Sequence, residues 1–201
     1  MGALLNRRRY MSVQKQEKVL FEMYNQYFDG TASSVVNTGI KLWDGNHNKF
    51  KIEVVYDQIT PARQNITLFT CKPDVTPYSG IRVRSGQSNH FELIVSETTT
   101  IMENTGGFSL LSNNFGDNYR KDATLEVNTL TIIRNDNILS LDYNGSTAKI
   151  QMSNVKTNNL DFLIGCDYKD TNNLTQRYYT GTVQKFVVTE LLATYDAGKN
   201  I

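Results

Sequence analysis

The sequence contains few of the residues that build disulfide scaffolds, metal sites or catalytic triads. Among its 201 residues are two cysteines, two histidines, three prolines and one tryptophan. Two cysteines are too few for the disulfide framework of a small secreted domain. The histidines, His47 and His90, stand in polar surroundings without zinc-ligand spacing and without a Gly-x-Ser-x-Gly motif. The sequence therefore predicts neither a zinc enzyme nor a Ser-His-Asp hydrolase.

Long apolar runs and an excess of one charge are also absent. No segment approaches the roughly 18 apolar residues of a membrane-spanning helix. The basic start is not followed by the apolar region of a signal peptide. Lys and Arg number 21 against 20 Asp and Glu, which gives a net charge of +1. Because a nucleic-acid-binding chain would be more basic, we expect neither a nucleic-acid partner nor a membrane.

The composition instead favours strands joined by polar turns. Asn and Thr are abundant; both are poor helix formers, and Thr favours strands whereas Asn favours turns. The length suits one large all-β domain with a core of its own. Apolar runs recur about every 10–15 residues, which is typical of a sandwich or barrel. The expected strands cover residues 18–23, 50–59, 66–71, 81–84, 91–95, 125–134, 138–144, 148–152, 162–166 and 178–191.

Two of these regions show the pattern most clearly. Residues 50–59 read FKIEVVYDQI, in which apolar and polar residues alternate so that one face of a strand is apolar. Residues 125–134 and 138–144 are two such runs separated by Asn-Asp-Asn. Asn and Asp tolerate the left-handed backbone conformation that short turns need. These two runs therefore predict a β-hairpin.

Other regions are less regular. Residues 27–43 carry two apolar pairs, each followed by turn residues, and predict three short strands. Residues 98–122 contain a Gly-Gly pair and several Asn, and predict a long loop with one short strand inside it. Cys71 and Cys166 end the apolar runs LFTC and LIGC, so we expect buried free thiols. A disulfide is the alternative, because its geometry cannot be tested from sequence.

Several short motifs, taken in order, resemble a known fold family. They are FDGT at 28–31, VNTGI at 36–40, RNDN at 134–137, YNG at 143–145, LIG at 163–165 and YTGTVQKFVV at 179–188. This succession resembles the concanavalin A-like, laminin-G-type jelly rolls. The resemblance implies an all-β jelly-roll sandwich of two antiparallel sheets over residues 13–201, preceded by a short N-terminal arm of residues 1–12.

The N-terminal arm carries a second resemblance. Its segment NRRRYM, leading into a jelly roll, resembles virion structural proteins of tailed phages that infect gut bacteria. This implies a non-enzymatic, homo-oligomeric virion protein, made in the host cytoplasm and displayed as a head fibre, capsid decoration or tail-associated domain. Arginine forks suit carboxylates on the surface of another virion protein. The expected partner-binding residues are Leu4, Leu5, Arg7, Arg8, Arg9, Tyr10 and Met11.

An alternative function is carbohydrate binding by a lectin-like module. Aromatic side chains in exposed loops offer an apolar face on which a sugar can stack, together with a polar edge. Trp43, Tyr78 and Tyr119 lie in loop-like surroundings and are the expected glycan-binding residues. The expected ligand is then a glycan of the host surface. Aromatic residues in such loops can also plug the ends of a sandwich.

A third function, glycoside hydrolysis, would need a closely spaced pair of carboxylates. Retaining glycosidases place the two groups about 5–5.5 Å apart. Glu53 and Asp57 are four positions apart with Val55 between them, and Asp161 and Asp167 are separated by the apolar run FLIGC. Neither pair has the alternating Glu-x-Asp-x-Glu pattern that jelly-roll glucanases carry on one strand. We therefore expect no enzymatic activity.

Two loops are rich enough in oxygen atoms to suggest calcium, which prefers six to eight oxygen ligands. Neither loop has the EF-hand pattern. The residues concerned are Asp167, Asp170, Asn172 and Asn173 in one loop, and Asn113, Asn114, Asp117 and Asn118 in the other. Ordinary turn formation is the preferred explanation of both loops and calcium binding is the alternative, so we expect no cofactor other than calcium.

Overall fold

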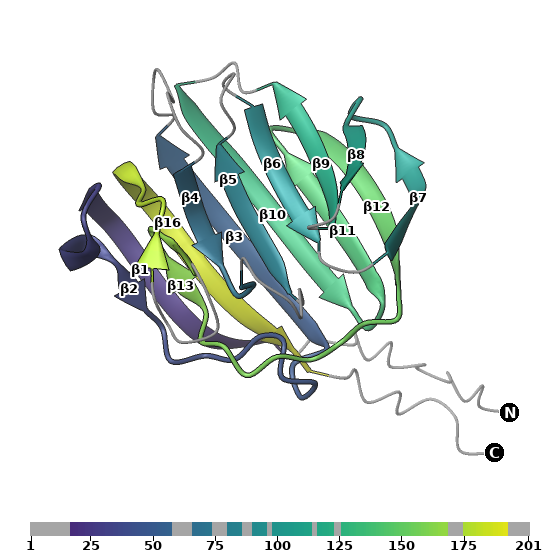
Figure 1. Ribbon diagram of the computed structural model, residues 1–201, viewed down its shortest axis with the longest axis horizontal. Helices are drawn as coiled ribbons and strands as arrows, with labels where there is room; N and C mark the ends of the chain where they lie inside the picture. The colour runs from purple at the N-terminus through teal and green to yellow at the C-terminus, as the bar shows by residue number, and fades with distance from the viewer. Residues whose placement is uncertain are drawn as a thin grey trace, which may run out of the picture.

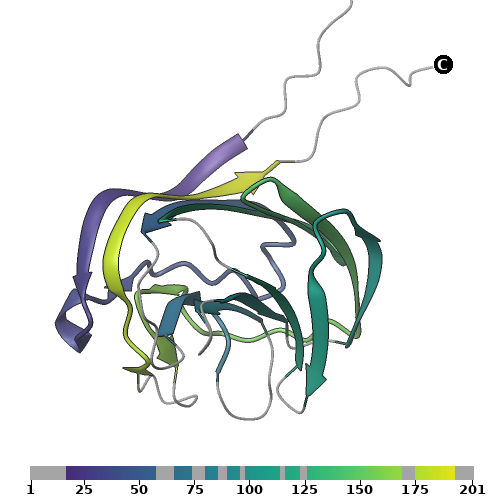
Figure 2. The same cartoon turned by 90° about the horizontal axis from the view of Figure 1, so that it is seen from above.

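The computed structural model describes residues 17–57, 66–73, 80–85, 90–95, 98–113, 116–122, 126–168 and 175–192. These residues form an all-β sandwich of two antiparallel seven-stranded sheets packed face to face, as predicted (Figures 1 and 2). The arm of residues 1–12 and the segments 13–16 and 193–201 lie outside the described residues. Among the described residues no helix is long and apolar enough to cross a membrane.

We call the two sheets sheet A and sheet B. Sheet A has the order β1 (Glu17–Asp29), β16 (Thr180–Leu191), β3 (Lys49–Asp57), β10 (Val127–Asn135), β11 (Ile138–Tyr143), β12 (Ser146–Ser153) and β7 (Thr98–Asn104). Sheet B has the order β2 (Val36–Asn37), β13 (Leu163–Ile164), β4 (Ile66–Thr70), β5 (Ile81–Ser85), β6 (His90–Val95), β9 (Gly116–Asp122) and β8 (Ser109–Asn113). A two-stranded ribbon of β14 (Asp167–Tyr168) and β15 (Thr175–Gln176) and a 3₁₀ turn, η1 (Ala32–Ser34), complete the elements.

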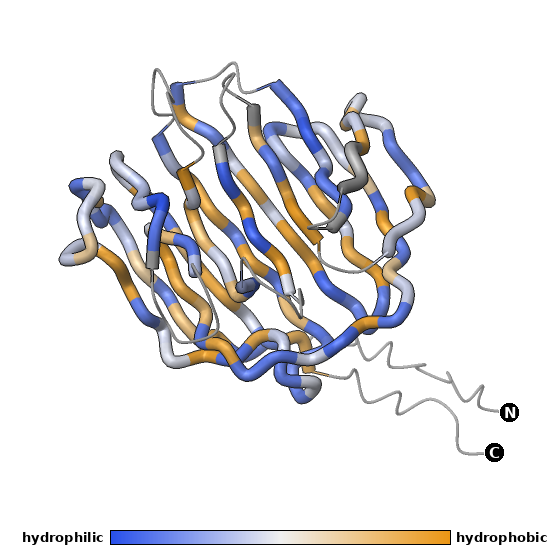
Figure 3. Tube along the Cα trace, in the orientation of Figure 1, coloured by the Kyte–Doolittle hydropathy of each residue, from blue (hydrophilic) through white to orange (hydrophobic). Residues whose placement is uncertain are grey.

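The alternation of apolar and polar residues decides which face of each strand is buried. In β3, Phe50, Ile52, Val54 and Tyr56 are buried, whereas the residues between them are partly exposed. Figure 3 shows the same alternation of apolar and polar residues along many strands of both sheets. The inward side chains of the two sheets meet in one continuous core.

Aromatic contacts join the two sheets within this core. The Phe186 ring, from sheet A, lies 5.4 Å between centroids from Phe69 of sheet B and 5.8 Å from Phe162. Farther along the sandwich, Phe91 of sheet B stacks on Tyr143 of sheet A at 4.3 Å. Such aromatic pairs add about 0.5–1.5 kcal/mol each beyond the burial of their area. They therefore hold the two sheets in one relative position.

The predicted hairpin is confirmed as β10 and β11, and Asp136 in its turn has a positive φ of 55°. The next turn, from β11 to β12, places both central residues at positive φ, Asn144 at 51° and Gly145 at 78°. This is the conformation of a type I′ turn, which matches the twist of the strands that it joins. The turn chemistry of the sequence therefore fixes the register of three neighbouring strands of sheet A.

The segment of residues 27–43 contains two of the three predicted short strands. Its first apolar pair ends β1, and β2 covers Val36–Asn37, but no strand follows Gly39. Thr38 instead donates its backbone N–H to the Phe162 carbonyl at 3.1 Å, and Phe162 donates to the Ile40 carbonyl at 2.7 Å. The segment thus passes alongside the chain that leads into β13 and closes one end of the sandwich.

The prediction of a long loop over residues 98–122 is wrong. This region forms three strands, β7, β8 and β9. β7 and β8 are edge strands, and β7 exposes most of its side chains. An edge strand with solvent on several sides has no need of an apolar alternation. β7 is rich in Thr and polar residues, so the search for alternating apolar residues did not detect this strand.

The two cysteines are buried free thiols, as expected. Burial, with a smaller contribution from the neighbouring Asp167 charge, raises the pKa of the Cys166 thiol to about 12. The thiolate is the reactive form of cysteine, so this thiol is chemically inert at neutral pH.

Replacement of Gly165 by alanine should destabilise the fold strongly. Gly165 has φ +89°, and an added Cβ would lie 2.4 Å from the ring of the buried Phe28. We expect the free energy of unfolding to fall by about 3 kcal/mol, measured by urea denaturation. Gly107 is the control, because it has φ +66° with nothing within 4 Å of an added Cβ. Gly107→Ala should cost only about 1 kcal/mol, and equal losses for both variants would contradict the contact.

The protein should also lose stability in alkaline solution. Burial raises the pKa of Tyr119 to about 12, helped by the Asp117 charge and opposed by a hydrogen bond with Thr99. Because the unfolded pKa is about 10, this contribution of roughly 2–3 kcal/mol is present below pH 10 and disappears as the pH rises towards 12. Urea denaturation between about pH 9 and pH 11 should show the decline, with a smaller decline in Tyr119→Phe. A free energy of unfolding that stays level across this range would refute the prediction.

Candidate functional site

The outer face of sheet B carries a row of charged side chains. The register pairs Arg84 of β5 with Glu92 of β6, and Glu92 with Arg120 of β9. Their neighbours Val83, Leu93 and Tyr119 are buried in the core. Since successive side chains of a strand point to opposite faces, all three charged residues point outward at the same level of the sheet.

Glu92 holds the two arginines together. Its carboxylate lies between them, with Oε2 2.5 Å from Arg84 Nε and Oε1 2.6 Å from Arg120 Nε. Only 2% of the Glu92 side chain is exposed, compared with 12% of Arg84 and 31% of Arg120. The Arg84 contact is a charge-assisted hydrogen bond, which restricts the orientation of both partners, whereas the Arg120 contact is a close ion pair in which Nε makes no hydrogen bond. Arg120 therefore stands at the surface in a defined position.

A second carboxylate, Asp167 of β14, is fully buried beside this row. Its Oδ2 accepts a hydrogen bond from Arg82 of β5 and another, at 2.8 Å, from Nη1 of Arg177. The Arg82 side chain is 2% exposed and that of Arg177 30% exposed. Asp167 thus ties the ribbon of β14 and β15 to sheet B and places Arg177 at the surface.

The four guanidinium groups outnumber the two carboxylates, and the group has a net charge of +2 in a chain whose total is +1. Burial lowers the pKa of the Arg84 guanidinium; Glu92 opposes this shift, and the like charges of Arg82 and Arg177 add to it. Among the described residues of this group, positive charges therefore outnumber negative ones. The face therefore attracts anions.

Two neutral polar groups lie on the same sheet. Asn118 of β9 is 1% exposed and Thr67 of β4 is fully buried. Within the described residues, neither Asn118 Oδ1 nor Thr67 Oγ1 has a hydrogen-bond partner. Buried polar atoms without partners are rare and are costly in an apolar environment. Both side chains lie below the solvent-accessible surface, so they are not counted among the groups that a ligand on sheet B could reach.

The aromatic residues predicted to bind glycans are not at this surface. Trp43 is 1% exposed and lies beneath the Arg134 guanidinium, whose central carbon is 4.1 Å from the indole centroid. Tyr119 is fully buried and contacts the Thr99 hydroxyl. A buried ring cannot stack on a sugar, so the expectation for both residues is corrected. Tyr78 lies outside the described residues.

The expected partner-binding residues of the arm cannot be placed, because they too lie outside the described residues. They are Leu4, Leu5, Arg7, Arg8, Arg9, Tyr10 and Met11.

His47 is partly buried, and its Nδ1 lies 3.1 Å from the Lys41 carbonyl and 3.3 Å from Asp44 Oδ1. The polar sequence around His47 therefore does not leave its imidazole fully exposed, and 25% of the side chain is accessible.

The carboxylates considered for catalysis are engaged elsewhere. Glu53 lies on the outer face of sheet A between Lys51 and Lys185, at 3.4 and 3.6 Å. Asp57 accepts a hydrogen bond from the Gln184 side chain at 2.7 Å. Both groups therefore have local partners that account for their positions.

The two oxygen-rich loops are only partly described. Asp117 accepts hydrogen bonds from the backbone and side chain of Thr99, whereas Asp167 is held by arginines. Within the described ranges, no group of three His, Cys, Asp or Glu residues is arranged to hold a metal ion. The remaining residues of these loops, Asp170, Asn172, Asn173 and Asn114, lie outside those ranges, as does the side chain of Asn113.

The sequence analysis missed the arginines and Glu92, although a signal was present. In IRVRS the arginines alternate with Ile81 and Val83, and in FELIV the glutamate separates Phe91 from Leu93. A charged residue within an apolar strand needs a partner or a function, because burial of an unpaired charge is costly. The pairing of strands, which brings these charges together, cannot be read from the sequence alone.

Removal of the Asp167 charge should destabilise the protein. Asp167→Asn keeps the size of the side chain but leaves two guanidinium groups, one of them buried, without this carboxylate. We expect the free energy of unfolding to fall by about 3–5 kcal/mol in urea denaturation. The exposed Asp136, 3.6 Å from Lys49, is the control, and Asp136→Asn should cost less than about 1 kcal/mol. Similar small losses for both variants would show that the buried ion pairs contribute little.

Solved structures with the same fold were found, at low sequence identity. The CBM40 module of the Ruminococcus gnavus IT-sialidase bound to α2,3-sialyllactose is 10% identical, with a TM-score of 0.56, over 89% of this chain and 96% of that chain. The leech intramolecular trans-sialidase in complex with 2,7-anhydro-Neu5Ac is 13% identical, with a TM-score of 0.53, over 89% and 27%. Domains LG4-5 of the mouse laminin α1 chain are 14% identical, with a TM-score of 0.51, over 89% and 44%.

No protein-family model and no curated protein matches the sequence. The structural likenesses show the fold alone. The chain is thus a concanavalin A-like jelly-roll sandwich, as its motifs implied.

Proposed function

We propose that this chain is a non-catalytic carbohydrate-binding domain that binds acidic sugars on the outer face of sheet B. The observation that carries the proposal is the pair of surface arginines, Arg120 and Arg177, each held in place by a buried carboxylate. A carboxylate group of a sugar is the matching anion, because a guanidinium group can donate two parallel hydrogen bonds to it.

The architecture favours binding over catalysis. Glu92 and Asp167 already accept hydrogen bonds from arginines, so their task is to orient the guanidinium groups. Prior orientation reduces the entropy lost when a ligand binds. The similar CBM40 module was solved with sialyllactose, whose terminal sugar carries a carboxylate, and this supports an acidic glycan as the ligand.

The virion function is a separate proposal. It depends on residues 1–12, which lie outside the described residues. The predicted virion partners and the predicted location on a particle depend on the same residues. The two proposals are compatible, since a glycan-binding domain displayed in many copies would gain avidity for a glycan-coated host surface. The glycan proposal does not depend on the arm.

The glycan proposal can be tested with 3′-sialyllactose by isothermal titration calorimetry. We expect the wild-type protein to bind, and Arg120→Gln to weaken binding at least about tenfold through the loss of a charge-assisted hydrogen bond. Arg177→Gln should act similarly. Lys41→Gln is the control, because Lys41 lies in the segment that closes one end of the sandwich and pairs with Asp161 at 3.3 Å. A folded protein that bound no acidic glycan on an array would disprove the proposal.

A further inference from the structure

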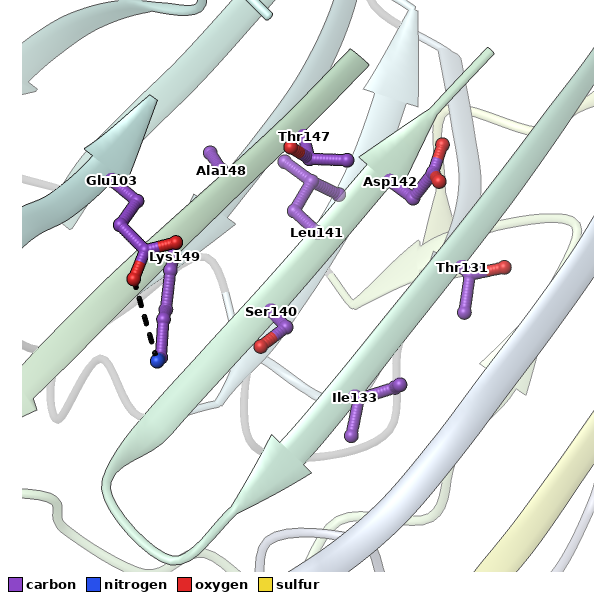
Figure 4. Close-up of a pocket in the computed structure, with 9 residues that line it drawn as sticks. All are labelled: Glu103, Thr131, Ile133, Ser140, Leu141, Asp142, Thr147, Ala148 and Lys149. Carbon is purple, nitrogen blue, oxygen red and sulfur yellow. Dashed lines mark ion pairs between the residues drawn. The ribbon is translucent and has the colours of Figure 1, made fainter. Parts of the chain in front are cut away.

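The outer face of sheet A contains a hollow that the proposed function does not use. Its volume is about 320 Å³, and it lies over β10, β11, β12 and β7 (Figure 4). The lining residues are Glu103, Thr131, Ile133, Ser140, Leu141, Asp142, Thr147, Ala148 and Lys149. Because the two sheets form separate layers, this face points away from the arginines of sheet B (Figure 2).

The strand register explains why the surface is hollowed here. Thr131 and Ile133 of β10 pair with Asp142 and Ser140 of β11, so that mostly short side chains form the floor. On one side stands Lys149 of β12, 3.6 Å from Glu103 of β7, as Figure 4 shows.

The opposite side of the floor is bounded by β3. Lys51 and Glu53, which form an ion pair at 3.4 Å, are the register partners of Ile133 and Thr131. Neighbouring strands lie about 4.8 Å apart, so the three spacings from β3 to β12 place the charged walls roughly 14 Å apart. Long paired side chains thus flank a floor of short ones.

The charge of the hollow is opposite to that of the arginine face. Its flanking lysines are paired with glutamates, Lys149 with Glu103 and Lys51 with Glu53. Asp142 Oδ1 accepts the Gly145 N–H at 2.9 Å, and among the described residues no cation pairs with this carboxylate. The hollow therefore has one uncompensated negative charge, which would repel an acidic sugar.

The remaining groups suit a neutral polyol. Thr131 and Ser140 offer hydroxyl groups that both donate and accept hydrogen bonds, the Thr147 hydroxyl is shared with Thr105 Oγ1 at 2.5 Å, and the Asp142 carboxylate can accept from two neighbouring donors. Ile133 offers an apolar contact for the C–H face of a sugar ring. The volume lies at the lower end of the range for ligand pockets, which corresponds to one or two sugar rings.

We propose that this hollow is a second glycan subsite, which binds a neutral mono- or disaccharide unit with Asp142 as its principal hydrogen-bond acceptor. The hollow has no aromatic lining residue, so its affinity is weak. Binding at two opposite faces would let one domain link two glycan chains, or two parts of a branched one, with the gain in avidity that two linked sites provide.

The experiment is a titration of the ¹⁵N-labelled protein with lactose, a neutral disaccharide, followed by NMR. We expect shifts of the Thr131, Ser140 and Thr147 amides that saturate at millimolar lactose. Asp142→Asn keeps an oxygen for the Gly145 N–H but loses the charge, and should weaken lactose binding at least about fivefold. Ser140→Gln fills the floor and should abolish the shifts.

Two controls separate this proposal from the acidic-sugar site. Arg120→Gln should leave the lactose shifts unchanged, and Asp142→Asn should leave the binding of 3′-sialyllactose by the arginines unchanged. The proposal is overturned if lactose shifts no amide of β10–β12, if it shifts only residues of sheet B, or if glycerol produces shifts of the same size at the same concentration. None of these results would affect the proposed function.

Discussion

The packing of sheet A on sheet B, through contacts such as that of Phe186 with Phe69, decides which residues of each strand face solvent. A strand whose register slips by one residue turns its entire apolar set outward. The burial of Val83, Leu93 and Tyr119 against this core therefore determines that Arg84, Glu92 and Arg120 point to solvent. The buried core residues thus determine the orientation of the charged side chains, although they do not form part of the surface themselves.

Sheets A and B use their outer faces differently. On sheet B, charged residues within apolar strands are packed against carboxylates, and the surplus is positive. On sheet A, charges of both signs alternate along the strands and largely pair with one another, as Glu53 does with Lys51 and Lys185. A nearly neutral chain thus has one face with a concentrated field and one with almost none. The net charge of the whole sequence, which is near zero, gives no indication of this difference between the two faces.

Much of the fold could be predicted from the sequence, because strands that face the core on one side alternate visibly. Residues 50–59 and the hairpin of 125–144 are examples, and each corresponds closely to β3 or to β10 and β11. The failures have one physical cause. Most side chains of β7 are exposed, and Trp43 and Tyr119 fill the core although polar residues surround them in sequence. The exposure of a residue depends on the parts of the chain that pack against it, and these cannot be identified from the neighbouring sequence.

The candidate site was harder to predict than the fold, because it consists of residues from four separate strands and one loop. Strand pairing brings Arg120 of β9 to Glu92 of β6 and the arginines of β5, whereas Asp167 comes from the separate ribbon of β14 and β15 and meets Arg82 through side chains. The same feature has an evolutionary consequence. Since the guanidinium groups are anchored by carboxylates on or beside the sheet, the loops at the rim can change in length and composition without displacing them. A lineage can therefore change the shape of the surface around the arginines while the charged anchor is inherited intact.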